Sequence, residues 1–580
     1  MKRLLGFYLR PYWKSIAVIV VLFMVQAAAF LFLPTLNARL INNGVVTGNT
    51  GYIGKMGGYM LLVALLQSIS GIGTTYLGAR TAMDFGRDVR GALFRKVEGF
   101  SQGELDRFGA PSLITRNTND VQQVQTMVNV ALSLMVFAPI MVLGGVIMAL
   151  RQDARLSLLL AVIIPVMVLV LGLVIGWAAP LYRSLQKKID RLSRVMRETL
   201  SGVRVIRAFA LGDYEQRRFE RANRELLHVG LSVMRVFAVM SPALWAILNF
   251  STVAIMWFGG RRVDSGAMRI GGLTAFSVYV AEIFIAILLV TVLASSIPRA
   301  AASASRIQEV LDVEPAIRDP ETLPATGGPG DGRWGFLEFK DVEFRYPGAA
   351  EAVLTNISFT ARPGQTSAIV GSTGCGKSTL ISLIPRLHDV TSGSITIDGV
   401  DIRHMKRADL WKHLGFVPQN AFLFSGTVAS NLRYGDRAAT EADLWRALSI
   451  AQGRDFVEAM PGGLNEPITQ GGTNVSGGQR QRLAIARALV KKADIYAFDD
   501  SLSSLDFKTD SMLRNALRRE VANATILVVA QRVTSVMHAD QIIVLDEGTI
   551  VGKGTHEELL KTCVTYQEIV YSQLTAEEAA

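Results

Sequence analysis

Cysteine is nearly absent from this chain. Only Cys375 and Cys563 occur among its 580 residues, and they lie far apart. Disulfide frameworks and cysteine-rich zinc sites both require several cysteines at short spacings. The sequence therefore excludes both of these structural classes.

Charge is also scarce, since 19% of the residues are charged and 50% are hydrophobic. This apolar content excludes a disordered chain, and the ordinary numbers of glycine (52) and proline (18) exclude a collagen-like or low-complexity protein. The mean hydropathy of +0.31 is unusual for a soluble protein. The formal net charge of +11 is compatible with nucleic-acid binding. In a membrane protein, however, such an excess more often marks cytoplasmic loops.

Six long stretches in the first half contain almost no charged residue. Each is long enough to cross a bilayer as a helix, which takes about 20 apolar residues. A soluble all-helical core is the alternative interpretation, but these stretches are longer than ordinary buried helices. We therefore expect six transmembrane helices, near residues 15–38, 56–79, 126–150, 156–182, 236–260 and 270–297.

Two segments between these stretches, 80–120 and 183–235, are long and basic. The positive-inside rule places them, together with the N-terminus, in the cytoplasm. Apolar residues such as Leu185, Ile189 and Leu192 recur at three- and four-residue steps, so the helices are expected to continue beyond the membrane. The expected organisation is a transmembrane domain over 1–320, a Gly- and Pro-rich linker over 321–336 and a second domain over 337–580.

Glu282 is the acidic residue inside an expected span. An ionisable group in a span is costly, and by default it indicates a residue that faces a partner or a water-filled pathway. In the alternative interpretation, the residue lies beside a wet cavity and binds nothing specific. Both interpretations stay open, and Glu282 is a candidate residue of a substrate path.

From Leu337 the pattern changes to short β-rich runs separated by turns and amphipathic helices, as in an α/β domain. The apolar run 366–370 is followed by a glycine-rich loop and then by the helical run 380–384. In such a loop the backbone N–H groups converge on a phosphate, the lysine reaches the β- and γ-phosphates, and the hydroxyl ligates Mg²⁺. The expected ATP-binding residues of this loop are Gly371, Ser372, Thr373, Gly374, Cys375, Gly376, Lys377, Ser378 and Thr379.

Other residues lie at positions from which they could contact a bound nucleotide or its Mg²⁺ ion. Tyr346 could stack on an adenine ring, although a lone strand tyrosine is more often a packing residue. Gln419 follows one expected strand, and Asp499 and Asp500 end another, at the carboxyl edge where such sheets bind ligands. Asp499 suits a position near Mg²⁺. The expected Mg²⁺ ligands are Ser378, Gln419 and Asp499.

Together these motifs resemble those of the ABC transporters, and the resemblance covers essentially the whole chain. By this resemblance, 371–379 corresponds to the Walker A motif, 498–499 to the Walker B motif, Gln419 to the Q-loop and Tyr346 to the A-loop. Asp506 corresponds to the D-loop aspartate. The residues that resemble the signature motif, and that would serve a partner's site, are Val475, Ser476, Gly477, Gly478 and Gln479.

The resemblance implies a membrane α-helical fold, with six transmembrane helices and cytoplasmic extensions, joined to an α/β P-loop ATPase domain. It further implies a half-transporter of the multidrug or lipid exporter type, with ATP and Mg²⁺ as cofactors. Such proteins act as dimers, in which two ATP molecules lie between the Walker A motif of one domain and the signature of the other.

Two residues depart from the family pattern, and both concern hydrolysis. Asp500 stands where the family usually has the glutamate that polarises the attacking water, and Gln531 stands where it usually has a histidine. Aspartate is one methylene shorter, and a misplacement on the order of 1 Å can cost about 10²-fold in rate. Glutamine can donate a hydrogen bond to a phosphate but carries no positive charge. The chain therefore resembles the degenerate-site subunit of a bacterial heterodimeric exporter.

The expected function is ATP-driven export of an amphipathic, drug- or lipid-like compound across the cytoplasmic membrane, by a multi-pass protein whose N-terminus and ATPase domain are cytoplasmic. The expected partners are a second half-transporter with intact glutamate and histidine, the lipid bilayer and a small amphipathic substrate, but no nucleic acid. Three alternatives stay open: a homodimeric exporter, an importer with an exporter-like fold, and an ATP-gated channel or regulatory membrane module.

Overall fold

The computed structural model describes residues 1–320 and 335–574, which form two compact units. The first unit contains Met1–Val97 and Pro111–Val313, and the second contains Glu98–Ala110 and the chain from Glu314 onward. The boundaries thus differ from the expected ranges. Packing explains part of the difference, because Glu104 in the Glu98–Ala110 segment accepts a hydrogen bond from the backbone N–H of Ala316 (3.0 Å). Most of the expected linker, residues 321–334, lies outside the described residues.

The first unit is helical. Its described residues include six helices that are long and apolar enough to cross a bilayer, which confirms the predicted fold class. Several helices continue well past the expected spans, as predicted. The helices are α1 (Lys2–Leu9), α2 (Trp13–Leu40), α3 (Thr50–Glu98), α5 (Ala110–Thr115), α6 (Val121–Leu134), α7 (Phe137–Gln152), α8 (Leu160–Ser201), α9 (Val203–Ala208), α10 (Gly212–Asp264) and α11 (Ile270–Leu311).

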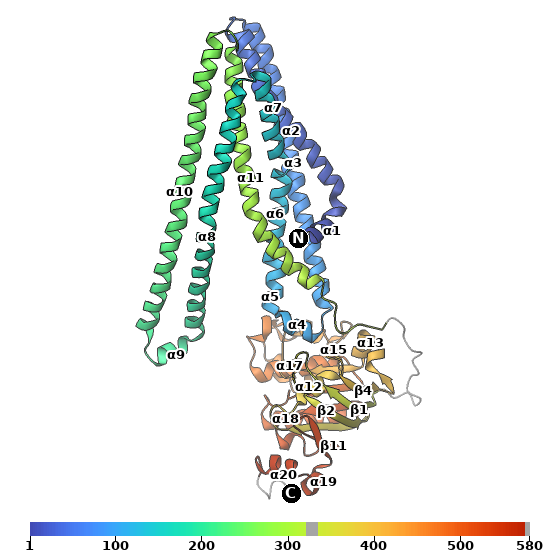
Figure 1. Cartoon of the computed structure of the whole chain (residues 1–580). Coiled ribbons are helices and arrows are strands. Elements are labelled where there is room, and N and C mark those ends of the chain that lie inside the picture. The colour runs from blue at the N-terminus through green and yellow to red at the C-terminus, as the bar shows by residue number, and fades with distance from the viewer. Residues whose placement is uncertain (321–334, 575–580) are drawn as a thin grey trace. The chain divides into compact units, whose positions relative to one another are not determined.

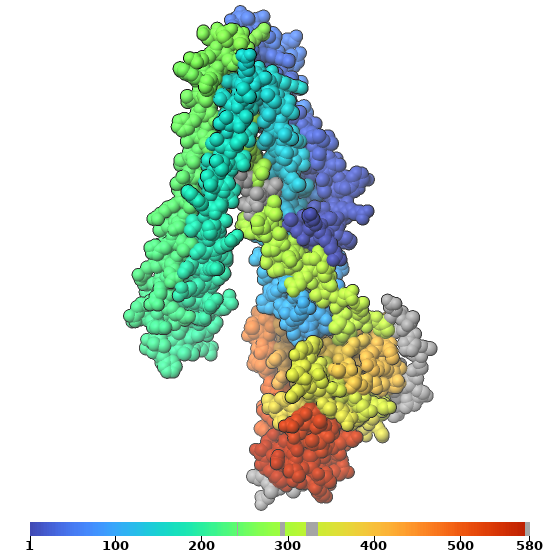
Figure 2. All heavy atoms as spheres, in the orientation of Figure 1, coloured from blue at the N-terminus to red at the C-terminus, as the bar shows by residue number. Residues whose placement is uncertain are grey.

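Two sets of helix contacts hold this unit together. Helices α8 and α10 run side by side, and the short α9 joins their ends (Figure 1). Their side chains pack along each other in the space-filling view (Figure 2). Helix α11 packs against α2, α6 and α7 around buried residues such as Phe276 and Tyr279. Buried Asp120 accepts hydrogen bonds from Arg306 and Ser303, which lie in the C-terminal part of α11, and so holds this part of the helix in place.

The second unit is an α/β domain built on a six-stranded sheet. The strand order is β12-β11-β3-β10-β9-β6, and all pairs are parallel except β11 with β12. Alternate residues enter separate cores on the two faces, as Tyr496 and Phe498 do on one side and Ile495 and Ala497 on the other. These strands are β3 (Thr366–Gly371), β6 (Leu414–Val417), β9 (Ile495–Asp499), β10 (Thr525–Val529), β11 (Gln541–Asp546) and β12 (Thr549–Gly554).

A second, antiparallel sheet has the order β2-β1-β4-β5, and β7 pairs with β8. These strands are β1 (Leu337–Phe344), β2 (Leu354–Ala361), β4 (Ser392–Ile397), β5 (Val400–Asp401), β7 (Gly426–Thr427) and β8 (Pro467–Ile468). The helices of the unit are α4 (Gln102–Phe108), α12 (Lys377–Leu383), α13 (Arg407–Lys412), α14 (Val428–Leu432), α15 (Glu441–Ile450), α16 (Arg454–Glu458), α17 (Gly477–Val490), α18 (Phe507–Glu520), α19 (His556–Thr562) and α20 (Val564–Tyr571).

The sheet order brings the candidate residues together. Strands β3, β10, β9 and β6 are consecutive parallel neighbours, so their carboxyl ends share one edge. The phosphate loop follows β3, Asp500 follows β9, Gln531 follows β10 and Gln419 follows β6. Segments that are far apart in the sequence therefore meet at a single site.

Candidate functional site

The phosphate loop connects β3 to α12 and has a backbone that requires glycine. Gly371 has a φ of 155°, and a Cβ atom there would lie 2.1 Å from the Leu545 carbonyl oxygen. Gly376 has a φ of 100°, and its Cβ would lie 2.8 Å from a Leu354 methyl group. Side chains would block this curl, in which backbone N–H groups can gather around an anion.

Lys377 folds back over this loop. Its Nζ donates hydrogen bonds to the carbonyl oxygens of Gly371 (2.8 Å) and Ser372 (2.6 Å), and it lies 3.7 Å from Cys375 Sγ. Both Lys377 and Cys375 are buried. The ammonium group is thus held at the mouth of the loop, where it can exchange a carbonyl partner for a phosphate oxygen.

Oxygen donors lie beside the loop. Ser378 Oγ donates to Asp499 Oδ1 at 2.8 Å. Burial raises the pKa of the Asp499 carboxyl, the hydrogen bond from Ser378 opposes this shift, and the charge of Asp500 adds to it. Mg²⁺ is coordinated by oxygen atoms, and substrate phosphates usually supply part of its coordination. The Ser378 hydroxyl, the Asp499 carboxylate and the Gln419 amide can supply further oxygen ligands. The side chains therefore fit the expected cation.

Asp500 is held by two amide groups. Its Oδ2 accepts hydrogen bonds from Gln419 Nε2 (3.2 Å) and Gln531 Nε2 (2.9 Å). Its Oδ1 is buried and has no hydrogen-bond partner among the described residues. Burial raises the pKa of the Asp500 carboxyl, and the hydrogen bond from Gln419 opposes this shift. The backbone of Asp500 is left-handed, with a φ of 45°, which is uncommon for a residue with a side chain.

Tyr346 lies two residues after β1, and its hydroxyl group is next to the start of α12. Its hydroxyl group shares a hydrogen bond with Thr379 Oγ1 at 3.0 Å. Its ring meets that of Phe344 edge to face, with centroids 4.8 Å apart. The structure thus brings Tyr346 to the same site as the phosphate loop, with part of its side chain exposed.

The signature-like residues 475–479 lie at the beginning of helix α17 and do not contribute hydrogen bonds to the phosphate loop of the described chain. Ser476 Oγ accepts the backbone N–H of Gln479 (3.2 Å), and Gln479 Oε1 accepts that of Ser476 (2.9 Å), so the two residues cap α17. Among residues 335–574, no hydrogen bond or ion pair joins 475–479 to the phosphate loop. Ser476 and Gly477 are exposed and remain accessible to another chain.

The D-loop has a contact that sequence reasoning missed. Asp506 caps α18, because its Oδ1 accepts the backbone N–H of Thr509 at 3.0 Å. Arg532 donates to the carbonyl oxygens of Ser503 and Leu505, at 3.2 Å each. The position of Arg532 directly after Gln531 was the available signal, but the motif alone does not reveal its partners.

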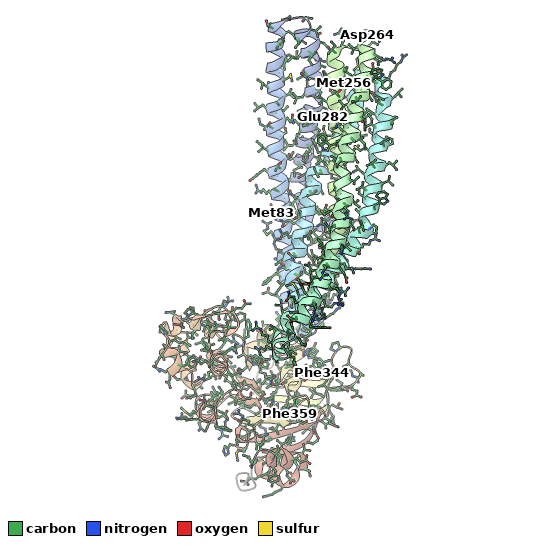
Figure 3. The ribbon with its side chains drawn as sticks, turned by 90° about the vertical axis from the view of Figure 1, so that its left-hand side faces the viewer. Met83, Met256, Asp264, Glu282, Phe344 and Phe359 are labelled. Atoms are coloured by element: carbon green, nitrogen blue, oxygen red, sulfur yellow. The ribbon has the colours of Figure 1, made fainter. Side chains whose placement is uncertain are left out.

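Glu282 lies in α11, outside the nucleotide site. Its side chain is 9% exposed, and its Oε2 is buried without a hydrogen-bond partner among the described residues. The neighbouring Tyr279 donates to the Leu31 carbonyl oxygen (3.0 Å) and so ties α11 to α2. Along the helices, Glu282 lies between the levels of Met83 and Met256 (Figure 3). The carboxyl group takes no part in the tie between the helices.

Comparisons with known proteins agree with this architecture. Residues 16–288 match the profile described as "ABC transporter transmembrane region", and residues 354–503 match the one described as "ABC transporter". The chain is 47% identical over 573 residues to an uncharacterized ABC transporter ATP-binding protein of Mycobacterium tuberculosis, which covers 98% of both chains. It is 32% identical over 570 residues to an ATP-dependent lipid A-core flippase of Thiobacillus denitrificans, with 98% and 97% coverage.

One solved structure supports the fold. A bacterial Atm1-family ABC exporter with ATP bound aligns with a TM-score of 0.79 and covers 98% of this chain and 99% of its own. Its sequence identity to this chain is 22%, so the match concerns the fold alone.

Proposed function

This chain belongs to the ABC transporter family, and from that premise we propose that it is one half of a heterodimeric exporter whose own ATP site is hydrolytically degenerate. The protein is a multi-pass membrane protein, and its α/β domain is an ATPase coupled to transport. The proposal concerns the division of labour between the two ATP sites of the dimer.

The proposal depends mainly on the surroundings of Asp500. Its Oδ2 accepts two amide hydrogen bonds, from Gln419 and Gln531. The short side chain is thus directed toward the two glutamines, and the oxygen that accepts both amide donors is less available to take a proton from water. Gln531 uses one amide N–H in the hydrogen bond to Asp500, and its neutral side chain brings no positive charge to a phosphate. Such a site would hold the nucleotide and activate water poorly.

The groups expected to bind nucleotide are retained. Lys377 would pair with phosphate oxygens, Tyr346 would stack on the adenine, and Ser378, Gln419 and Asp499 would hold Mg²⁺. The cation would neutralise phosphate charge when bound. The exposed Ser476 and its neighbours in 475–479 would complete the partner's site, with glutamate and histidine supplied by a different chain.

The direct test replaces Asp500 in the purified pair. We expect Asp500→Asn to leave ATP turnover within roughly twofold of the original, because the partner's site carries most of the hydrolysis. Replacing the catalytic glutamate of the partner chain should lower turnover by about 10²-fold or more. Steady-state phosphate release measures both. Abolition of turnover by Asp500→Asn alone would show that this site is competent, as in a homodimeric exporter.

The proposed cargo is an amphipathic compound moved outward across the cytoplasmic membrane, with the N-terminus and the ATPase domain in the cytoplasm. The apolar helices and the similarity to lipid A-core flippases support a lipid- or drug-like molecule. Transport measured in inside-out and right-side-out vesicles distinguishes export from import. Conductance without hydrolysis would instead indicate an ATP-gated channel.

Glu282 is proposed to contact the cargo. An unpartnered carboxyl group inside a membrane protein favours a positively charged ligand. We expect Glu282→Gln to raise the concentration of a cationic amphiphile needed for half-maximal ATPase stimulation by about tenfold, which corresponds to roughly 1.4 kcal/mol. The response to a neutral amphiphile should change much less. Ser277→Ala, on the same helix, is the control, and equal responses of Glu282→Gln to both amphiphiles would contradict the role.

A further inference from the structure

The switch loop, defined here as Ala530–Val533, follows β10 and carries Gln531. Two side chains of the switch loop, those of Gln531 and Arg532, contact different parts of the domain. Gln531 Nε2 donates to Asp500 at 2.9 Å, whereas Arg532 donates to the D-loop carbonyl oxygens of Ser503 and Leu505 and lies over the Phe507 ring, 5.0 Å from its centroid. The position of this loop therefore determines where Gln531 meets Asp500 and where Arg532 meets the D-loop.

A third contact holds the backbone of the switch loop. Gln573 Oε1 accepts the backbone N–H of Val533 at 2.9 Å. Gln573 Nε2 donates to the Gln531 carbonyl oxygen at 2.8 Å. One side-chain amide thus pairs with the backbone on both sides of Arg532, as a neighbouring strand would, through its oxygen and one of its N–H groups.

The amide is held from a firmly packed element. Gln573 lies two residues beyond α20, where Tyr566 and Val570 are fully buried. Its backbone N–H donates to the Val570 carbonyl oxygen at 3.0 Å. Tyr566 is further tied to α19 through a 2.7 Å hydrogen bond with His556 Nδ1. The C-terminal helices therefore give the amide a fixed base from which to restrain a loop.

We propose that Gln573 is a positioning residue of the ATPase reaction, which acts through the switch loop. Its amide fixes the backbone from which Gln531 reaches Asp500 and Arg532 reaches the D-loop. Loss of the amide would let Gln531 and the D-loop shift while the groups around the phosphate loop stay in place. The consequence is a slower chemical step with unchanged nucleotide binding. In a heterodimer whose partner site carries most of the hydrolysis this slowing would be masked, so it is measured in the chain assembled only with copies of itself, where every site contains Gln573.

Helix α20, which precedes Gln573, offers a matched control. Gln567 Nε2 donates to the Leu560 carbonyl oxygen at 2.7 Å and joins α20 to α19 without contacting the switch loop. Gln567→Ala therefore removes a comparable amide hydrogen bond from the C-terminal helices. Gln573→Glu keeps the acceptor for Val533 but loses the donor to Gln531.

The experiment measures steady-state ATPase kinetics of the full-length chain, reconstituted only with copies of itself. A hydrogen bond of this kind contributes a factor of roughly two to ten, so we expect Gln573→Ala to lower kcat about fivefold with the KM for ATP within about twofold. Gln573→Glu should fall between Gln573→Ala and the original protein. Gln567→Ala should leave both constants within about twofold. Hydrogen exchange of the peptide that contains Val533 should accelerate in Gln573→Ala but not in Gln567→Ala.

Three results would overturn the proposal. An unchanged kcat in Gln573→Ala would show that the amide does not position the site. An equal loss in Gln567→Ala would indicate a general role of the C-terminal helices in stability. A higher KM for ATP with an unchanged kcat would assign Gln573 to nucleotide binding. If Gln573→Ala does not assemble, Gln573→Glu decides, because it retains one of the two hydrogen bonds.

Discussion

The double substitution Asp500→Glu and Gln531→His should raise ATP hydrolysis by about 10²-fold in the chain assembled only with copies of itself. Glutamate extends the carboxylate by about one C–C bond, roughly 1.5 Å, toward the expected position of the attacking water. Histidine supplies a group that can carry positive charge toward the γ-phosphate. Both changes are needed, because Gln531 would otherwise keep its hydrogen bond to the carboxylate.

Phosphate release by the purified, reconstituted homo-assembly measures this gain. Asp494→Glu is the matched control, because Asp494 pairs with His413 (2.6 Å) and takes no part in the nucleotide site. Each single variant should recover only part of the rate. A chain that already hydrolyses ATP at full speed in the homo-assembly, without any substitution, would contradict the degenerate site.

Lys377→Ala should weaken ATP binding to this chain by about 10²-fold, since hydrogen bonds to charged groups each contribute roughly 1.5–3 kcal/mol. The structure supplies the reason. The Lys377 ammonium is already held at the loop by the carbonyl groups of Gly371 and Ser372. A phosphate therefore gains a charged donor without the cost of ordering a free side chain.

Equilibrium binding of ATP to the detergent-solubilised protein tests the loss. Lys412→Ala removes an exposed lysine that pairs with Asp409 on α13, and it should bind ATP as the original protein does. Near-normal affinity in Lys377→Ala would show that the loop binds phosphate without its lysine. The result does not depend on the partner chain, so it separates nucleotide binding from the division of hydrolysis between two sites.

Much of the nucleotide site could be predicted because its residues are close neighbours in the sequence. The spacing of the glycines in the phosphate loop predicts a tightly curled backbone with positive φ angles, and the structure has positive φ angles at these glycines. The order of strand, loop and helix around Lys377 is likewise local. By contrast, the hydrogen bond between Tyr346 and Thr379 spans 33 residues, and no pattern within either segment indicates it.

The unit boundaries show a similar limit. Hydropathy indicated where helices cross the membrane, but it did not indicate that 98–110 packs with the α/β unit. Helix α4 in this segment is short and polar, and its placement depends on partners such as Ala316. A composition-based boundary cannot detect such a contact, because the segment carries no long apolar run of its own.

The sequence by itself determined the six membrane-spanning helices, the phosphate loop and the replacement of the usual glutamate and histidine by Asp500 and Gln531. The first two depend on residue types that are close together in the sequence, and the third depends on the resemblance to the family pattern. Only the tertiary structure decided that Asp500 is held by Gln419, 81 residues away, and that Gln573 restrains the switch loop from 40 residues away. Those contacts form because parallel strands align their carboxyl ends and α20 packs on the same domain, and a linear sequence does not specify which distant amides will then meet.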